Sequence, residues 1–273
     1  MQRHFAFLAV LLPLAAFSTT LPTLQDHLPS SEQVRVNPPG LRHAEPPPAN
    51  ATAEELENRA EQLRSEKAYA DAIDYYRAAI KKDHRNAGLY NKLGIVELMI
   101  QHYGDARKNF EHAIKFDHNF ADAYNNLGVV RYEEKNYSRA IDEYGKAIRL
   151  RQDSASFYSN LGAAYYMKKE WEPATEAYSH ALQLDPDIFG RTSRTGVTAQ
   201  LPSPEDRARF DYVIAKLYAK RGDSDRSLQY LRRSMEEGYK GIKGVYKDPE
   251  FSSLRSDPRF TQLMASQPPS IPE

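Results

Sequence analysis

Side-chain amides recur in the sequence at one spacing. Asn91 and Asn125 lie 34 residues apart, as do Asn126 and Asn160, and Lys92 precedes Asn126 by the same interval. A primary amide offers both a donor and an acceptor, so a row of Asn side chains can pair with a peptide backbone without reading its sequence. Apolar and aromatic residues repeat alongside. They are Ile95, Val129, Met99, Met167, Tyr132 and Tyr166. This pattern indicates binding rather than bond-making chemistry.

Patterns typical of catalysis are missing from the sequence. None of the eight His residues has HExxH spacing, and there is no GxSxG, phosphate-loop or GxGxxG signature. The absence of cysteine excludes disulfides, thiolate metal sites and a Cys nucleophile. We therefore predict no catalytic residue, no metal ligand and no cofactor.

Charge is balanced along the 273 residues, with 37 Lys plus Arg against 37 Asp plus Glu. Phosphate backbones require concentrated cationic charge, so a nucleic acid is not the expected partner. With 41% hydrophobic and 27% charged residues, the composition is that of a soluble folded protein.

The N-terminus predicts export. Arg3 followed by the apolar run from Phe5 to Phe17 is typical of a signal peptide over residues 1–18. The run is short for a membrane span, although an uncleaved anchor is the alternative. Residues 19–52 are rich in Pro and predict a disordered linker. We expect a periplasmic or secreted bacterial protein with no membrane span in its mature chain.

Four units of 34 residues follow, at 53–86, 87–120, 121–154 and 155–188. The phrases starting at Leu89, Ala123 and Phe157 align without gaps, and a weaker copy starts at Glu55. Each unit has helical apolar spacing with one central break, which predicts two helices. Small residues recur where the helices would approach, opposite aromatic residues. The aromatic set is Tyr76, Phe110, Tyr144 and Tyr178. A fixed period of this length indicates a solenoid.

The stretch "YSNLGAAYYMKKEWEPATEAYSHALQLDP" from Tyr158 to Pro186 resembles the tetratricopeptide repeat. The four units cover about half of the chain. They depart from the family pattern at the final Pro, which is His84, His118 and Gln152 in the first three units. The resemblance implies an all-α, right-handed α-solenoid of helix-turn-helix repeats.

The resemblance also implies that the first helix of each repeat lines a groove. It would place the amides named above, with Lys92, Ile95, Val129, Met99, Tyr132, Tyr166 and Met167, in that groove as a site for a peptide segment. The alternative is that the amides bond between neighbouring repeats and meet no ligand. A carboxylate-binding clamp is not expected, because acidic residues oppose Lys92 and Arg64. These are Glu54, Glu57, Glu61 and Asp122.

Beyond residue 188 the register breaks. We predict a flexible insertion at 189–207, a degenerate fifth hairpin at 208–241 and a capping segment at 242–273. In the last segment, "DPEF" at Asp248 and "DPRF" at Asp257 predict two helical turns over the fifth hairpin.

The function predicted from these features is non-catalytic protein–protein interaction, as an adaptor, scaffold or assembly factor. One alternative is an accessory subunit of an envelope enzyme, which would require Arg191, Arg194 and Asp206 to converge on a cleft. Another is self-association, in which the groove takes the Pro-rich leader or tail of a second copy.

Overall fold

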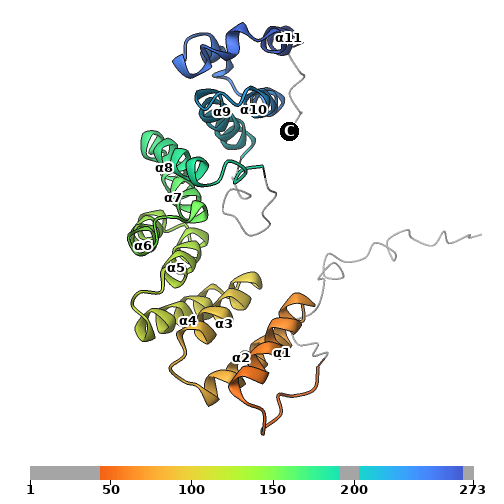
Figure 1. Ribbon diagram of the computed structural model, residues 1–273, viewed down its shortest axis with the longest axis vertical. Helices are drawn as coiled ribbons and strands as arrows, with labels where there is room; N and C mark the ends of the chain where they lie inside the picture. The colour runs from red at the N-terminus through yellow and green to blue at the C-terminus, as the bar shows by residue number, and fades with distance from the viewer. Residues whose placement is uncertain (1–43, 191–202, 267–273) are drawn as a thin grey trace, which may run out of the picture. The chain divides into compact units, whose positions relative to one another are not determined.

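Helices in consecutive antiparallel pairs make up the protein, in a computed structural model that describes residues 44–190 and 203–266 (Figure 1). The predicted signal peptide and most of the linker lie outside these residues. The first four pairs, with their bounds, are α1 (Ala53–Ser65) and α2 (Tyr69–Lys82), α3 (Ala87–Met99) and α4 (Tyr103–Phe116), α5 (Ala121–Glu133) and α6 (Tyr137–Leu150), and α7 (Ala155–Met167) and α8 (Trp171–Leu184). Within the described ranges there is no strand, and none of the helices is long and apolar enough to cross a membrane. The predicted all-α fold class is confirmed.

Every hairpin turns at one residue with a left-handed backbone. Lys67, Gln101, Lys135 and Lys169 have φ values of 63°, 62°, 59° and 61°. The amide after each of them donates to the carbonyl five residues earlier, as in the 2.8 Å bond from Asn136 N to Arg131 O. This closure satisfies a free carbonyl at the end of the first helix and sends the chain back antiparallel.

A glycine of the first helix meets an aromatic ring of the second inside three repeats. A Cβ placed on Gly128 would lie 2.6 Å from the Tyr144 ring, and one on Gly162 would lie equally close to Tyr178. Both rings are fully buried. The small residues predicted from the sequence therefore let the two helices approach until the ring rests on backbone.

Neighbouring repeats pack in sequence order. The second helix of one repeat contacts the first helix of the next, as α2 does α3, α4 does α5 and α6 does α7. First helices also touch one another, α3 with α5 and α5 with α7. Residues at one position of these three helices are therefore brought into a row.

The end of the Pro-rich linker differs from the prediction of disorder. Residues 44–52 lie against α2, where the Tyr75 hydroxyl donates to Glu45 O (3.1 Å) and Lys82 Nζ donates to Ala49 O (2.8 Å). Ile73 and Tyr75 are buried on that face. The second helix of the first repeat is apolar on this face, and Ala44 and Ala51 pack against its cluster.

The C-terminal region contains a fifth helix pair, α9 (Pro204–Lys220) and α10 (Ser224–Glu236). Helix α9 begins inside the range predicted as an insertion, because the Ser203 hydroxyl accepts from Asp206 N (3.1 Å) and Pro204 occupies the first turn. Residues 191–202 of that range lie outside the described part of the chain.

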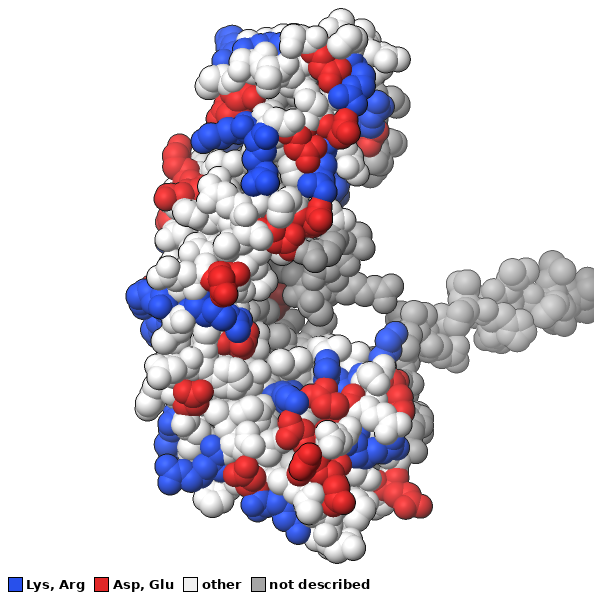
Figure 2. Space-filling model, in the orientation of Figure 1, with Lys and Arg blue, Asp and Glu red and all other residues white. Residues whose placement is uncertain are grey.

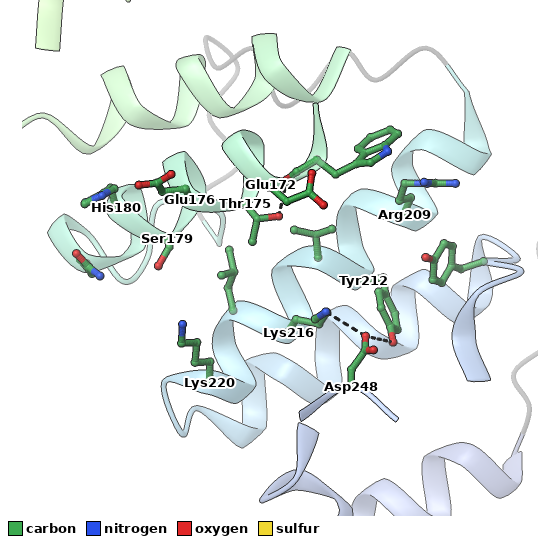
Figure 3. A pocket seen from close by; sticks show the side chains of 15 residues that line it. Glu172, Thr175, Glu176, Ser179, His180, Arg209, Tyr212, Lys216, Lys220 and Asp248 are labelled. Carbon is green, nitrogen blue, oxygen red and sulfur yellow. Dashed lines mark hydrogen bonds and ion pairs between the residues drawn. The ribbon is translucent and has the colours of Figure 1, made fainter. Parts of the chain in front are cut away.

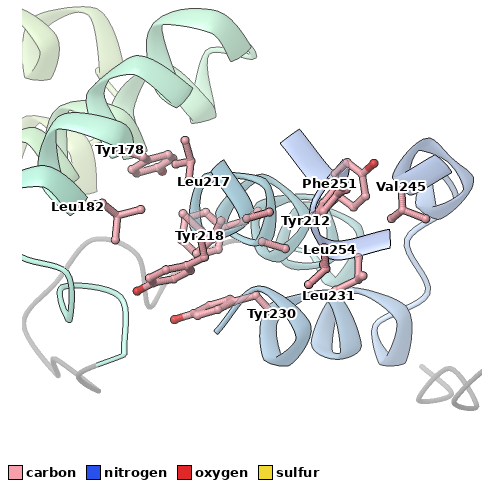
Figure 4. Packing of buried hydrophobic residues seen from close by; sticks show 14 of the residues in the cluster. Tyr178, Leu182, Tyr212, Leu217, Tyr218, Tyr230, Leu231, Val245, Phe251 and Leu254 are labelled. Carbon is pink, nitrogen blue, oxygen red and sulfur yellow. The ribbon is translucent and has the colours of Figure 1, made fainter. Parts of the chain in front are cut away.

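Three short 3₁₀ helices and one α-helix follow α10. They are η3 (Ile242–Tyr246), η4 (Pro249–Phe251), η5 (Leu254–Ser256) and α11 (Pro258–Ser266). Phe251, Leu254, Phe260 and Leu263 are buried in one cluster with α9 and α10 (Figure 4). The two "DP" phrases thus begin short helices that cover the fifth hairpin.

Candidate functional site

The predicted amides form a hydrogen-bonded chain across three repeats. Asn160 donates to Asn125 Oδ1 (3.0 Å), Asn125 donates to Asn126 Oδ1 (3.3 Å), and Asn126 donates to Asn91 Oδ1 (3.0 Å). The first and last of these bonds join neighbouring repeats. The structure therefore brings all four amides together and gives them a role in holding the array.

This chain of bonds uses only part of the amide capacity. The NH₂ groups of Asn125, Asn126 and Asn160 each carry two hydrogens and donate one of them to another Asn, whereas Asn91 accepts. Asn91, Asn125 and Asn160 are 7%, 9% and 9% exposed, whereas Asn126 is half-buried. Asn126 is thus the amide most open to a ligand, and the others fix its orientation.

Lys92 lies beside the amides but is paired within the protein. Its Nζ is 2.7 Å from a Glu57 oxygen and 3.1 Å from a Glu61 oxygen. Burial opposes ionisation of Glu61, but its contacts with Arg64 (2.6 Å) and Lys92 outweigh burial and lower the pKa of Glu61 to about 2. Lys92 and Glu57 therefore form a charge pair between the first two repeats, at the positions where the later repeats have paired amides.

The predicted apolar strip divides into exposed and buried members. Met99 is 41% exposed, and Ile95, Val129 and Met167 are half-buried. Tyr132 and Tyr166 differ from the prediction that they contact a ligand, because they are 5% and 2% exposed.

Both tyrosines are buried because the next helix begins with an aromatic residue that covers them. Tyr132 packs edge-on against Tyr137 (5.2 Å between ring centroids), and Tyr166 packs edge-on against Trp171 (5.0 Å). The Tyr166 hydroxyl also donates to Asp206 O (2.7 Å). Tyr132 and Tyr166 therefore pack in the interior and do not form part of the exposed surface.

The described residues contain no cluster of three or more His, Asp or Glu side chains that could hold a metal ion. Asp206, one residue of the alternative enzyme site, caps α9 together with Ser203 (2.7 Å), while Arg191 and Arg194 lie outside the described residues. Figure 2 shows acidic and basic side chains interspersed over the face it presents.

A cleft between α8 and α9 was not predicted from the sequence. Its volume is about 730 Å³, Trp171 is among the residues that line it, and Glu172 of α8 faces Arg209 and Tyr212 of α9 across it (Figure 3). The break in register after residue 188 is the sequence signal that could have indicated it, because a change in linker length changes how two helices meet.

Comparisons with known proteins agree with the helix pairs. The family model described as TPR repeat matches residues 130–169, and the model described as Tetratricopeptide repeat matches residues 155–188. No curated protein matches the chain.

Several solved structures resemble the fold. Pseudomonas aeruginosa pilF is 20% identical with a TM-score of 0.51, over 75% of this chain and 82% of that chain. MamA from Desulfovibrio magneticus RS-1 is 17% identical with a TM-score of 0.50, over 72% and 97%. Another MamA structure is 24% identical with a TM-score of 0.48, over 67% and 96%. Residues 130–188 thus match tetratricopeptide-repeat models, and the helix pairs share the fold of the structures with TM-scores of 0.50 and 0.51.

Proposed function

We propose that the protein is a non-catalytic interaction module that holds an extended segment of a partner protein along α3, α5 and α7. Tetratricopeptide repeats build extended binding surfaces from stacked helix pairs. The observation that carries the proposal is the chain of amide bonds from Asn160 to Asn91, which runs across three repeats in the direction that an extended peptide would follow.

Preorganisation is the physical advantage of this arrangement. The hydrogen bonds already made by each Asn fix its rotamer, so a ligand would not have to order these side chains on binding. The free hydrogen of Asn126 is available to a backbone carbonyl of the partner. One amide contact of this kind selects for an extended backbone rather than for a particular side chain.

Apolar side chains beside the amides supply the remaining contact. Ile95 and Met99 of α3 and Val129 of α5 keep part of their surface in water. Burying such a surface beneath an apolar side chain of the partner releases about 25 cal/mol per Å². Met in addition adapts to ligands of different shape.

Selection of ligands from a random peptide library on the full chain tests this proposal. Selected peptides should bind the wild type, and calorimetry should show a loss of affinity of about tenfold or more for Val129→Lys, which places a charge in the apolar strip. Asn126→Ala should weaken binding less. Asp142→Asn, an exposed change on α6, is the matched control and should retain wild-type affinity.

Equal affinity of the selected peptides for Val129→Lys and the wild type would place their site elsewhere. Helicity and melting temperature of each variant must stay close to those of the wild type, so that a loss of binding is not a loss of folding. If Asn126→Ala has no effect while Val129→Lys abolishes binding, the apolar strip acts alone and the role of the amides is purely structural.

We also propose that the protein acts outside the cytoplasm. The support is the sequence pattern of residues 1–18, a short cationic start followed by an apolar run. N-terminal sequencing of the protein purified from its source should find a start near residue 19. A chain that still begins at Met1 would favour the uncleaved anchor.

A further inference from the structure

The cleft between α8 and α9 differs in composition from the cleft of about 620 Å³ at the junction of α6 with α7, which is lined by Arg131, Arg139, Lys146 and Arg149. Contacts between α8 and α9 are sparse, whereas α6 packs closely along α7. The rings of Tyr178, Phe189 and Phe210 join the fifth hairpin to the repeats and meet edge-on with centroids 5.4–5.9 Å apart. Alongside this anchor the two helices leave the 730 Å³ cleft open.

Aromatic and apolar residues of α9 take the place of amides in this cleft. Counted from Ala208 as the start of the fifth unit, Tyr212 and Val213 occupy the positions of Asn125 and Asn126. Both line the cleft. The chemistry of this site is therefore distinct from that of the face formed by α3, α5 and α7.

Two aromatic donors at the cleft have no hydrogen-bond partner among the described residues. They are the indole N–H of Trp171 and the hydroxyl of Tyr239. Trp171 is held in place by the edge-on contact with Tyr166 (5.0 Å) and by Arg209, whose guanidinium lies 4.7 Å from the indole. Tyr239 lies 4.7 Å from Tyr212, centroid to centroid. Rigid rings with free donors are suited to bind exposed backbone carbonyls.

Two carboxylates on α8 give the cleft an acidic wall. Glu172 and Glu176 are exposed, lie one helical turn apart, and form no ion pair with any described residue. The cations opposite them are engaged in part: Lys216 pairs with Asp248 (3.1 Å) and Glu250 (3.4 Å), and Arg209 stacks on Trp171. Lys220 lies at the other end of the cleft from Arg209 (Figure 3). The two carboxylates of α8 are therefore the groups that can bind a cation of a ligand.

We propose that this cleft binds a proline-rich segment of a partner protein that carries a Lys or Arg next to its prolines. Such a segment adopts a polyproline II helix, whose carbonyls are unpaired and whose rings pack on aromatic side chains. Trp171 and Tyr239 donate to those carbonyls, and the proline rings pack against Trp171, Val213 and Leu217. Glu172 and Glu176 bind the flanking cation.

Fluorescence gives a direct readout, because Trp171 is the only tryptophan in the sequence. The probe is the synthetic peptide Pro-Pro-Leu-Pro-Pro-Arg, added to the full chain. We expect a saturable blue shift of the emission as the peptide displaces water from the indole. The affinity should fall as salt is added, since the ion pair is at the surface.

Charge variants test whether the carboxylates of α8 bind the cation of the peptide. Glu172→Gln together with Glu176→Gln should weaken binding about tenfold. Asp142→Asn is the matched control, because Asp142 occupies on α6 the position that Glu176 occupies on α8, and it should bind with wild-type affinity. A peptide with Glu in place of Arg should bind at least tenfold more weakly than the original.

Three results would overturn the proposal. They are an emission spectrum that does not respond to the peptide up to about 1 mM, an affinity unchanged by the double Glu variant, and tighter binding of the Glu-containing peptide, which would assign the cleft to acidic ligands. Circular dichroism of the double variant confirms that its fold is intact. Failure here leaves the proposed function of α3, α5 and α7 standing, because neither helix of the cleft belongs to that face.

Discussion

The four regular repeats and the fifth hairpin build the same helix pair from different contacts. In the third repeat Gly128 lies against Tyr144, whereas Ala215 and Leu231 occupy the equivalent positions in the fifth. Alanine is larger than the glycine that it replaces, and leucine is smaller than the tyrosine that it replaces, so the two changes in volume offset each other. Ser227 and Ser234 stand where the regular repeats have alanine. Their hydroxyls donate to Ala215 O (2.9 Å) and Ala208 O (2.7 Å).

A second pair of positions shows a change of chemistry rather than of size. Tyr158 stacks on His180 (5.3 Å) in the fourth repeat, and Tyr90 stacks on His112 in the same way in the second. In the fifth hairpin the equivalent residues are Asp211 and Arg233, with Asp211 Oδ2 3.1 Å from Arg233 Nε. The comparison teaches that total volume at the helix contact is constrained, while the pair beside it can be aromatic or ionic.

The largest expected effect concerns the anchor between the two regions. Phe210→Ala removes a buried ring from the contact with Tyr178 and Phe189 and should cost about 3–5 kcal/mol of local stability. Hydrogen exchange should show α9 and α10 losing protection while α3 to α6 keep theirs, because each repeat depends on its neighbours. Phe157→Ala, at the equivalent position inside the regular array, should instead lower protection on both sides of α7. Identical exchange patterns for the two variants would show that the fifth hairpin is coupled to its neighbours in the same way as a regular repeat.

Asp211 should make the fifth hairpin sensitive to pH. Burial raises the pKa of Asp211 to about 7, opposed by the charge of Arg233 and assisted by Glu237. An unfolded Asp titrates near 3.9, so between about pH 4 and pH 7 the folded state holds a proton that the unfolded chain has lost. The free energy of unfolding contributed by this group therefore falls as the pH rises through that window.

Replacing Asp211 with Asn should remove this dependence. The difference in unfolding free energy between Asp211→Asn and the wild type should grow in favour of the variant by about 2–4 kcal/mol from pH 4.5 to pH 8. Urea titrations at several pH values measure it, and Asp142→Asn serves as an exposed control. A constant difference across the range would show that Asp211 is ionised throughout.

The glycine–aromatic contact can be converted into that of the fifth hairpin. Gly128→Ala should cost about 1–3 kcal/mol, because its Cβ overlaps the Tyr144 ring. Adding Tyr144→Leu reproduces the Ala215–Leu231 pair and should recover part of the loss, so the two changes should be non-additive. Gly145→Ala on α6 has room for its Cβ and should stabilise by about 0.5–1 kcal/mol. Thermal melts of the wild type, Gly128→Ala, Tyr144→Leu, the double variant and Gly145→Ala provide the measurement.

The smallest expected effect lies in the turns. Lys135 has φ 59°, whereas the fifth hairpin uses Gly222 with φ 80° at the equivalent position. Lys135→Gly relieves the left-handed strain and should stabilise by about 0.5–1 kcal/mol, and Gly222→Lys should destabilise by a similar amount. Changes of the same sign in both variants would mean that side-chain contacts at the turn outweigh the backbone.

Part of the candidate site followed from the sequence and part did not. The 34-residue spacing was enough to place Asn91, Asn125, Asn126 and Asn160 on one face. It did not reveal that these amides bond to one another, because both a ligand and a neighbouring repeat can satisfy the same donors. Nor did it show the burial of Tyr132 and Tyr166, which depends on rings at the start of the following helix.

Periodicity by itself determined the helix pairs, their order and the small-residue contacts, because these depend on interactions within a repeat or between adjacent repeats. Tertiary structure alone decided the docking of residues 44–52 on α2 and the opening between α8 and α9. Those features join segments whose spacing follows no repeat. Their geometry depends on contacts between residues at non-equivalent positions, and a repeat pattern does not predict such contacts.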